Sequence, residues 1–287
     1  MSARKAVSAR KTVNTVLRRV TGYELTRYTP PGPAPEIRGP QSGDRLVTDP
    51  IFLMAPVRSG STLLRVLLNG HSRLHAPQEL HLRHLQVTAR TADARRSMEI
   101  LGLNVADLEH VLWDRLLHRE LVRSGKDFIV EKTPGHALLW QRIATCWPDA
   151  RYLFLLRDPT AIAYSWYDAD PKKRTLEGSV AKTLRYMQAV EAARQTLPGH
   201  TVRYEELTKD PVGVLKGVCD YLDIDMEPGL AEYGLPADGL VRGLGDWRSK
   251  VRSGQVQAPR ALPADLLTPK ELEPFCTAWG YPTHPRT

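Results

Sequence analysis

The stretch Ile51-Phe-Leu-Met-Ala-Pro-Val-Arg-Ser-Gly-Ser-Thr-Leu-Leu64 is the part of the sequence that decides the fold. Its first four residues are apolar and predict a buried strand, and the apolar character of residues 61–68 predicts a helix that ends before Gly70. A loop between a strand and a helix presents backbone N–H groups and the positive end of the helix dipole to one point. The stretch therefore predicts a site for an anion.

The loop differs from an ATP-binding P-loop because it lacks the Gly-Lys pair and carries Arg58. The planar guanidinium of Arg58 suits a tetrahedral oxyanion. Gly60 permits close approach of a ligand to the backbone, and hydroxyl donors come from Ser59, Ser61 and Thr62. The alternative interpretation is a structural corner in which the serine and threonine side chains only cap the helix.

The chain has 287 residues, of which 42% are hydrophobic and 25% are charged, an ordinary composition for a globular protein. Its net charge of +8 favours anionic partners, a class that includes nucleotides, nucleic acids, membrane surfaces and acidic substrates. Residues 1–20 hold no acidic side chain but six basic ones, namely Arg4, Lys5, Arg10, Lys11, Arg18 and Arg19. We interpret residues 1–43 as a solvated basic arm with a proline-rich linker, rather than a membrane or nucleic-acid arm, and residues 44–287 as one domain.

The sequence contains neither an apolar secretory signal nor a run of roughly 20 apolar residues that would span a membrane. We therefore expect a soluble, cytoplasmic protein. Cys146, Cys219 and Cys276 form no CxxC pair, and no His/Cys cluster has zinc spacing. We expect Cys146 and Cys219 to be buried thiols.

Strand-like and helix-like segments alternate after residue 50. Short apolar runs predict strands at 51–54, 128–131, 152–156 and 201–204. Amphipathic and apolar segments predict helices at 104–123, 137–147, 160–167, 179–196 and 211–222. This alternation predicts an α/β fold with a mostly parallel central sheet flanked by helices on both faces. The C-terminal segment, rich in glycine and proline, predicts a loop-rich flap with one late helix, which Thr268-Pro-Lys-Glu271 begins as a capping box.

Distinctive polar residues stand at the carboxyl ends of the predicted strands, namely Arg58, Lys132, Arg157 and Tyr204. Open parallel sheets bind their ligands at this edge. We therefore expect these side chains to belong to one site.

Two motifs carry a resemblance to a known family. Pro56-Val-Arg-Ser-Gly-Ser-Thr62 resembles the 5′-phosphosulfate loop of sulfotransferases that use 3′-phosphoadenosine-5′-phosphosulfate (PAPS). Leu155-Leu-Arg-Asp-Pro-Thr-Ala-Ile-Ala-Tyr-Ser165 resembles the 3′-phosphate motif of that family, in which a serine follows the arginine by eight residues, as Ser165 follows Arg157. The alternative is that Arg157 pairs with a neighbouring acid and that Ser165 merely fills a helix position.

Three further segments fit the same family over roughly residues 50–250. Val202-Arg-Tyr-Glu-Glu-Leu207 is similar to a strand-to-helix segment whose tyrosine approaches the nucleotide, and Glu131-Lys-Thr-Pro134 to an element near the sulfuryl group. Gly245-Asp-Trp247 is similar to an element that closes over the nucleotide, but the family's preceding Arg-Lys-Gly is Leu240-Val-Arg242 here. Either Arg242 or Arg248 is a candidate for the missing charge. The arrangement is closer to bacterial and tyrosylprotein-type sulfotransferases than to cytosolic steroid and phenol enzymes.

The resemblance implies a P-loop-like fold, PAPS as the sulfuryl donor and no metal requirement. It implies that Arg58 and residues 59–62 hold the 5′-phosphosulfate and that Lys132 stabilises the bridging oxygen of the leaving nucleotide. For Lys132 the alternatives are a surface lysine and an ion pair with Glu131. Glu79 matches the place of the glutamate base in tyrosylprotein-type relatives, and His75 and His81 are rival bases.

Other functions stay open at this point. A P-loop kinase of similar fold is the first alternative, a non-catalytic nucleotide-binding protein the second, and a basic nucleic-acid binder the third, which no motif supports. The sequence does not reveal the acceptor; we expect a small molecule, with a natural product, a lipid, a carbohydrate and a carrier-tethered acyl chain as candidates. Specificity is expected in segments 81–104, 168–178 and 225–260. Four aromatic residues are candidates for a ligand wall, although core packing is the favoured interpretation for Trp140, Tyr164, Trp166 and Tyr167.

Overall fold

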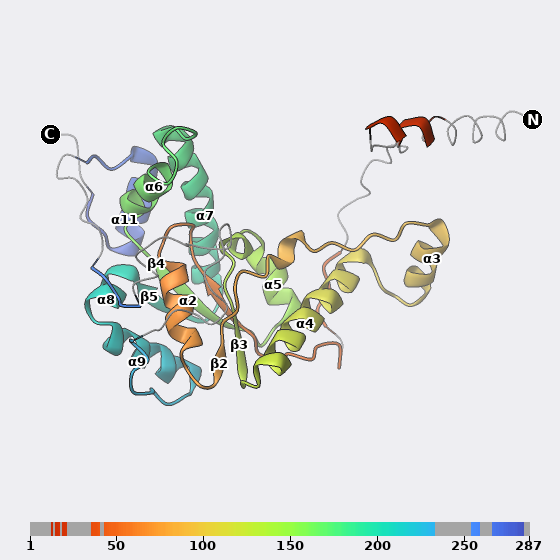
Figure 1. Cartoon of the computed structure of the whole chain (residues 1–287), viewed down its shortest axis with the longest axis horizontal. Coiled ribbons are helices and arrows are strands. Elements are labelled where there is room, and N and C mark those ends of the chain that lie inside the picture. Colours follow the sequence, from red (N-terminus) through yellow and green to blue (C-terminus); the bar gives the residue numbers. More distant parts are fainter. Residues whose placement is uncertain are drawn as a thin grey trace, which may run out of the picture. The chain divides into compact units, whose positions relative to one another are not determined.

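The computed structural model describes residues 13, 15–17, 19–21, 36–40, 43–232, 254–258 and 266–283 (Figure 1). Contacts divide the chain into two units, Met1–Glu36 and Ile37–Thr287. In the first unit the described residues between 13 and 21 are helical. Most of the basic arm lies outside the described residues, so the arm and the boundary at residue 43 stay predictions.

The second unit is built on a five-stranded sheet with the strand order β2-β3-β1-β4-β5. All pairs are parallel, and β1 lies in the middle with Leu53 opposite Leu153 of β4. This confirms the predicted α/β class. The strands are β1 (Ile51–Met54), β2 (Leu74–His75), β3 (Phe128–Glu131), β4 (Arg151–Leu156) and β5 (Gly199–Arg203).

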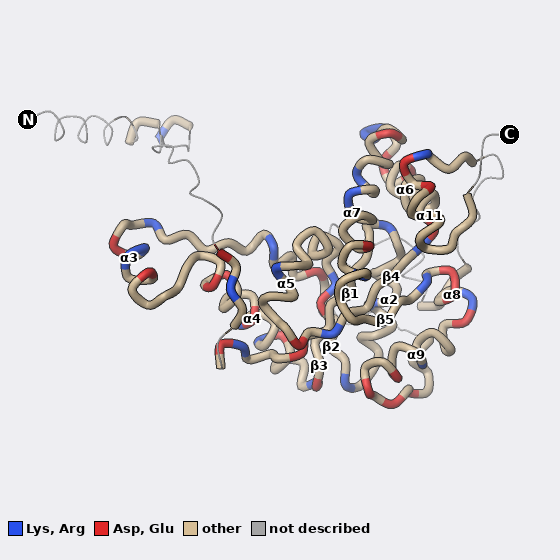
Figure 2. Tube along the Cα trace, turned by 180° about the vertical axis from the view of Figure 1, so that it is seen from behind, with Lys and Arg blue, Asp and Glu red and all other residues tan. Residues whose placement is uncertain are grey.

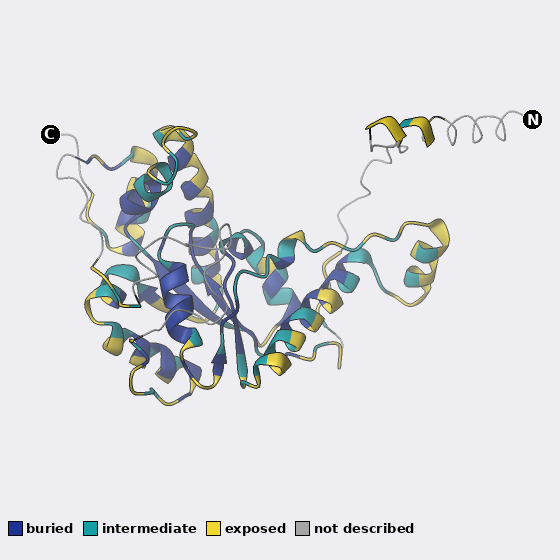
Figure 3. Cartoon of the chain, in the orientation of Figure 1, coloured by how far each residue is buried: buried dark blue, intermediate teal, exposed yellow. Residues whose placement is uncertain are grey.

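Successive residues of a strand point to opposite faces of the sheet, so a strand with only apolar residues has two apolar faces to bury. Helices cover both faces (Figure 1). Ile51 and Leu53 face one apolar cluster, which is completed by α2 (Ser61–Asn69), α8 (Tyr204–Lys209) and α9 (Pro211–Leu222). Phe52 and Met54 face the other cluster, which is completed by α4 (Val105–Ser124), α5 (Trp140–Cys146), α6 (Pro159–Tyr167), α7 (Leu176–Thr196) and α11 (Glu273–Trp279). Figure 3 shows the strands buried between these two layers.

Charged residues are concentrated on the helices and connecting segments, and the strands carry few (Figure 2). Glu131 ends β3 and Arg203 ends β5, so the charges within these two strands occur at their carboxyl ends. The buried interior of a parallel sheet has no solvent for an unpaired charge. These terminal charges are therefore positioned by the fold at the edge where ligands bind.

Helix ends agree with local sequence signals in most places. Asn104 caps α4 through a capping box with Asp107, and Gly125 ends the helix in the left-handed conformation. Residues 137–147, predicted as one helix, instead form a 3-10 segment, η2 (Pro134–Leu139), followed by α5. The helix α3 (Ala92–Ile100) was not predicted, since none of its residues is buried and no apolar stripe marks it.

The predicted capping box at residues 268–271 is wrong. The α-helix begins only at Glu273, after a 3-10 turn, η3 (Lys270–Leu272), and its N-cap residue Leu272 makes no side-chain cap. The hydroxyl of Thr268 instead pairs with that of Thr160 on α6, at 3.1 Å. The C-terminal segment thus joins the helical layer, and Trp279 donates from Nε1 to Glu191 of α7 at 2.8 Å.

The three cysteines are buried free thiols, as expected for Cys146 and Cys219. Burial raises the pKa of Cys146 to about 12, so this thiol stays protonated at physiological pH. In the described part of the chain, no helix is both long enough and apolar enough to cross a membrane.

Candidate active site

The loop between β1 and α2 has an unusual backbone. Arg58 and Gly60 both have positive φ values, 65° and 92°. A Cβ atom on residue 60 would collide with the ring of Tyr204, so glycine is required there for space as well as for conformation. The helix α2 starts at Ser61 with no acidic residue in its first turn, so no side chain of that turn offsets the partial positive charge of its N-terminus.

The two motifs that lie about a hundred residues apart in the sequence meet at this loop. Arg157 donates from NH1 to the carbonyl of Arg58 at 2.9 Å, and Arg58 donates from Nε to Ser165 Oγ at 3.2 Å. The guanidinium of Arg157 lies 4.5 Å from the ring centroid of Tyr204, a cation–π distance. Among the described residues Arg157 forms no ion pair, and its buried Nε has no acceptor. The acid-paired alternative for Arg157 therefore finds no support in this part of the chain.

Lys132 follows β3 and is 1% exposed. Its Nζ lies 2.5 Å from Glu79 Oε1 and 3.5 Å from Thr62 Oγ1. Burial lowers the pKa of Lys132 from its ordinary value, and the neighbouring carboxylate of Glu79 acts in the opposite direction. Neither alternative for Lys132 fits, because it is not at the surface and its ion-pair partner is Glu79 rather than Glu131.

Glu131 has a different task. Its carboxylate accepts hydrogen bonds from the Leu80 amide at 3.2 Å, the Thr133 hydroxyl at 2.7 Å and His136 Nδ1 at 2.6 Å. Burial alone would raise the pKa of Glu131, but His136 and these hydrogen bonds together lower it below its ordinary value. The Thr133 hydroxyl also accepts from the His81 amide at 3.2 Å. The buried carboxylate thereby fixes the backbone next to Glu79.

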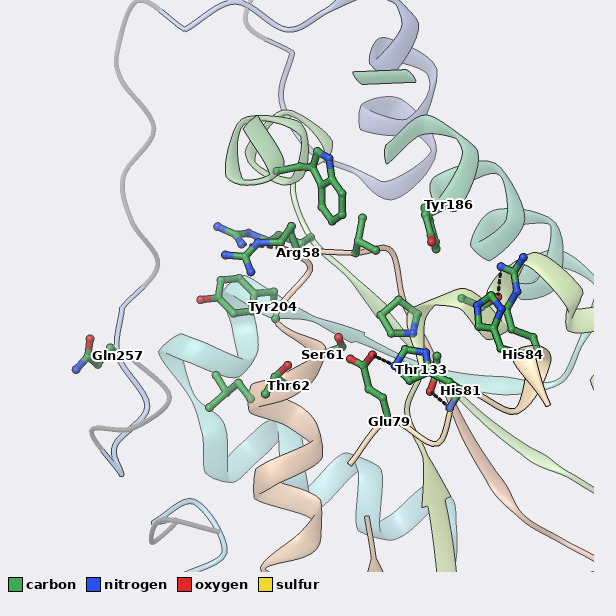
Figure 4. Close-up of a pocket in the computed structure, with 18 of the residues that line it drawn as sticks. Arg58, Ser61, Thr62, Glu79, His81, His84, Thr133, Tyr186, Tyr204 and Gln257 are labelled. Atoms are coloured by element: carbon green, nitrogen blue, oxygen red, sulfur yellow. Dashed lines mark hydrogen bonds and ion pairs between the residues drawn. The ribbon is translucent and has the colours of Figure 1, made fainter. Parts of the chain in front are cut away.

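A pocket of about 380 Å³ opens over these groups (Figure 4). Seven of the predicted site residues line it, namely Arg58, Gly60, Ser61, Thr62, Glu79, Arg157 and Tyr204. Three others lie behind its wall: Ser59, which is fully buried, Lys132, which reaches Glu79, and Ser165, which supports Arg58. The structure thus brings all ten predicted residues to one region, seven at the pocket surface and three directly behind it.

The two histidines that rival Glu79 as the base occupy different places in the structure. His81 lines the pocket, and its Nε2 lies 3.3 Å from Glu79 Oε2. His75 is in β2, where its Nε2 lies 3.9 Å from Glu120, and it does not line the pocket. Glu79 therefore stands between Lys132 and His81, with one oxygen toward each.

Several pocket residues were not predicted. Arg83 and His84, from η1 (Leu82–His84), were not named individually but lie in the segment 81–104 that was expected to carry specificity. Gly135 from η2 and Tyr186 from α7 were not expected at all. Trp166, for which core packing was favoured, also lines the pocket and stacks under Arg174 at 4.2 Å. Gly245, Asp246, Trp247, Arg242 and Arg248 lie outside the described residues. Among the residues that the structure describes, no group of three or more His, Cys, Asp or Glu side chains has the arrangement of a metal site.

Comparisons with known proteins agree on one family. A family model described as the sulfotransferase family matches residues 50–228. Nodulation protein NoeE of Sinorhizobium fredii (strain NBRC 101917 / NGR234) is 30% identical over 125 residues, which are 40% of this chain and 30% of that protein. Protein-tyrosine sulfotransferase 1 of Danio rerio is 24% identical over 193 residues, which are 61% of this chain and 53% of that protein. The chain thus matches only about a third to a half of each relative's length.

Two solved structures share the fold. The sulfotransferase domain from the curacin biosynthetic pathway is 21% identical with a TM-score of 0.60, covering 84% of this chain and all of that one. The sulfotransferase domain from the Synechococcus PCC 7002 olefin synthase is 22% identical with a TM-score of 0.56, covering 85% of this chain and all of that one.

Proposed function

This chain belongs to the sulfotransferase family, and from that premise we propose that it moves a sulfuryl group from PAPS to a hydroxyl or amine of a small-molecule acceptor. The second product would be 3′,5′-adenosine bisphosphate. The observation that carries the proposal is the convergence of the Arg58 loop, Arg157 and the Lys132–Glu79 pair on one pocket. A natural product, a lipid, a carbohydrate and a carrier-tethered acyl chain are the acceptor classes in view.

The donor-binding residues divide by the group that each would hold. Arg58, Ser61 and Thr62 at the start of α2 would hold the 5′-phosphosulfate, with the backbone kept open by Gly60. Arg157, with Ser165, would hold the 3′-phosphate, and the buried Nε of Arg157 that lacks an acceptor in the described chain fits an anionic ligand. Tyr204 would lie against the nucleotide. When bound, PAPS supplies an activated sulfuryl group.

Glu79 and Lys132 would perform complementary tasks in the transfer. Glu79 would take the proton from the acceptor hydroxyl as that oxygen bonds to sulfur. Lys132 would donate to the bridging oxygen as the S–O bond breaks and its electron pair passes to the nucleotide. These tasks need positioned charges and no metal ion, which was also the expectation from the sequence.

The buried pair is consistent with these tasks. At 2.5 Å the two charges neutralise each other in a site where either charge alone would be costly. Donor binding would give Lys132 a second anionic partner and release one oxygen of Glu79 toward the acceptor. His81, 3.3 Å from Glu79, is the remaining alternative base, and separate substitutions of the two residues decide between them.

The experiment that tests the proposal is thermal unfolding with 3′,5′-adenosine bisphosphate, ADP and ATP in parallel, each with and without magnesium. A ligand at 100 times its dissociation constant adds about 2.7 kcal/mol to the free energy of unfolding. We expect selective stabilisation by the bisphosphate without magnesium, and its loss in Arg157→Gln. Stabilisation by ATP with magnesium alone would favour the kinase alternative.

Turnover separates a catalyst from a non-catalytic nucleotide-binding protein. Lys132→Met should abolish transfer from PAPS to an accepted substrate, whereas a protein that only binds nucleotide would transfer nothing before or after substitution. A cytoplasmic location and the absence of a nucleic-acid partner stay predictions from the sequence.

A further inference from the structure

The pocket has two ends with different residues. Figure 4 shows Arg58 and Tyr204 at one end, Glu79, Thr133 and His81 in the middle, and His84 and Tyr186 at the opposite end. The proposed donor residues occupy the first end, and the proposed base lies in the middle. The opposite end is therefore where the body of an acceptor would lie while its hydroxyl is beside Glu79.

Arg83 contributes a half-buried cation to this lining. It belongs to η1, which Leu82 anchors in the core at 1% exposure. The Arg83 side chain lies against Gly135, and NH1 donates to the Gly135 carbonyl at 3.4 Å. A guanidinium has five N–H donors, so most of its hydrogen-bonding capacity is left for a ligand.

The charge of Arg83 is not compensated within the described residues. Three other half-buried arginines have a carboxylate at 2.7–2.9 Å: Arg142 with Glu109, Arg151 with Asp49 and Arg194 with Glu191. Arg83 has no ion pair in the same part of the chain. Of the described residues that line the pocket, Glu79 alone has a carboxylate, and Lys132 and His81 already occupy both of its oxygens.

We propose that the acceptor carries an anionic group, a carboxylate or a phosphate ester, which Arg83 binds while the acceptor's hydroxyl lies at Glu79. A partly buried guanidinium held over a backbone carbonyl is suited to bind such an oxyanion through two parallel N–H···O bonds. The surface of His84 borders the same end of the pocket and adds further donors. The inference rests on the proposed function for the placement of the hydroxyl.

The test measures binding by isothermal titration to the full chain saturated with 3′,5′-adenosine bisphosphate. The probes are 4-hydroxybenzoate, 4-hydroxyphenyl phosphate and the neutral methyl 4-hydroxybenzoate. We expect the native protein to bind at least one anionic probe about tenfold or more tightly than the ester, a difference of about 1.4 kcal/mol. The better of the two anionic probes identifies whether the group is a carboxylate or a phosphate.

Arg83→Gln should remove the preference for the anion and leave the affinities for the ester and the bisphosphate unchanged. Arg83→Lys should keep part of the preference for the anion, because lysine keeps the positive charge but lacks the planar guanidinium that makes two parallel hydrogen bonds. The matched control is Arg96→Gln on the exposed α3, which removes the same charge away from the pocket and should behave as the native protein.

Gly135→Ala provides a second variant should Arg83→Gln fail to fold. A Cβ atom on residue 135 would lie 3.2 Å from Arg83 Cδ, so the Arg83 side chain must shift by a few tenths of an ångström while it keeps its charge, which should weaken anion binding. Equal affinity of the native protein for acid, phosphate and ester, including no measurable binding of any, overturns the inference. So does an equal loss for all three probes in Arg83→Gln. Failure of the bisphosphate itself to bind would instead overturn the proposed function.

Discussion

Lys132 and Glu79 form a buried ion pair, with Nζ 2.5 Å from Oε1 and side chains only 1% and 9% exposed. Each charge is stable in this place because the other is present. Removal of one partner leaves an uncompensated charge in the protein interior, and removal of both does not.

The first prediction follows from this coupling. Lys132→Met should lower the free energy of unfolding by about 3–5 kcal/mol, and the double variant Lys132→Met with Glu79→Gln should recover much of that loss. Urea denaturation of the two single variants and the double variant measures the interaction. Strictly additive losses would contradict the pairing.

The second prediction concerns the identity of the base. Glu79→Gln should lower kcat about 10²- to 10⁴-fold, because general-base catalysis contributes a rate factor of that size. The affinity for 3′,5′-adenosine bisphosphate should stay unchanged. His81→Gln should reduce kcat less. A collapse of turnover in His81→Gln, with Glu79→Gln nearly active, would move the base assignment to the histidine.

The third prediction uses the two roles of Gly60. Gly60→Ala should abolish bisphosphate binding, since the new Cβ would collide with Tyr204 in addition to straining a backbone with a φ of 92°. Gly102→Ala is a matched control, because its φ is 72° but no atom of the described residues lies within 4 Å of the added Cβ. Both should lose about 1–2 kcal/mol of stability from the left-handed conformation, and only the first should lose the ligand. Normal binding by Gly60→Ala would show that the loop tolerates the collision.

The fourth prediction concerns acid stability. Burial, and next the charge of Arg142, lower the pKa of His110 from 6.5 to about 3, and His110 Nε2 accepts from Arg142 Nε at 2.9 Å. The folded state thus binds this proton less readily than the unfolded state. The stabilising contribution is complete above about pH 6.5 and is lost progressively as the pH falls toward 3.

For His110 alone this amounts to about 2 kcal/mol between pH 8 and pH 5. His110→Gln should show a flatter dependence of unfolding free energy on pH over that range than the native protein. His118→Gln, on the more exposed side of the same helix, is the matched histidine-to-glutamine control. Equal pH dependence of the unfolding free energy in His110→Gln and the native chain would show that His110 does not contribute to it.

The parts of the site that the sequence predicted are those encoded by contiguous residues. Residues 51–64 form strand, loop and helix as expected, and the Arg157–Ser165 spacing brings both side chains to the loop because a strand end and one helix determine it. Lys132 was placed correctly after β3. Its partner was not, because Glu79 is separated from it by more than fifty residues and only tertiary packing joins them.

The parts that were missed depend on several elements at once. Arg83 lies in the segment 81–104 that was expected to carry specificity, but its meeting with Gly135 and Tyr186 was not predicted. These residues come from two 3-10 segments and a long helix, and no local pattern connects them. The predicted start of the helix at 137–147 was wrong, because Pro134 begins a tighter 3-10 turn that continues to Leu139. Thr268 had the sequence signature of a helix cap, but its hydroxyl forms a hydrogen bond with that of Thr160, which is distant in the sequence.

The Leu80 amide donates a hydrogen bond to Glu131, and the His81 amide donates to Thr133, whose hydroxyl donates to the same carboxylate. These bonds divide one short segment into a part that is fixed and a part that tolerates substitution. The part next to Glu79 is held from beneath by a buried carboxylate, and the part beyond Leu82 is not. We therefore expect substitutions at Arg83 and His84 to change which molecules the pocket binds without moving Glu79. For a protein engineer, the proposed acceptor end of the pocket is a place to vary separately from Glu79, and libraries should begin at residue 83.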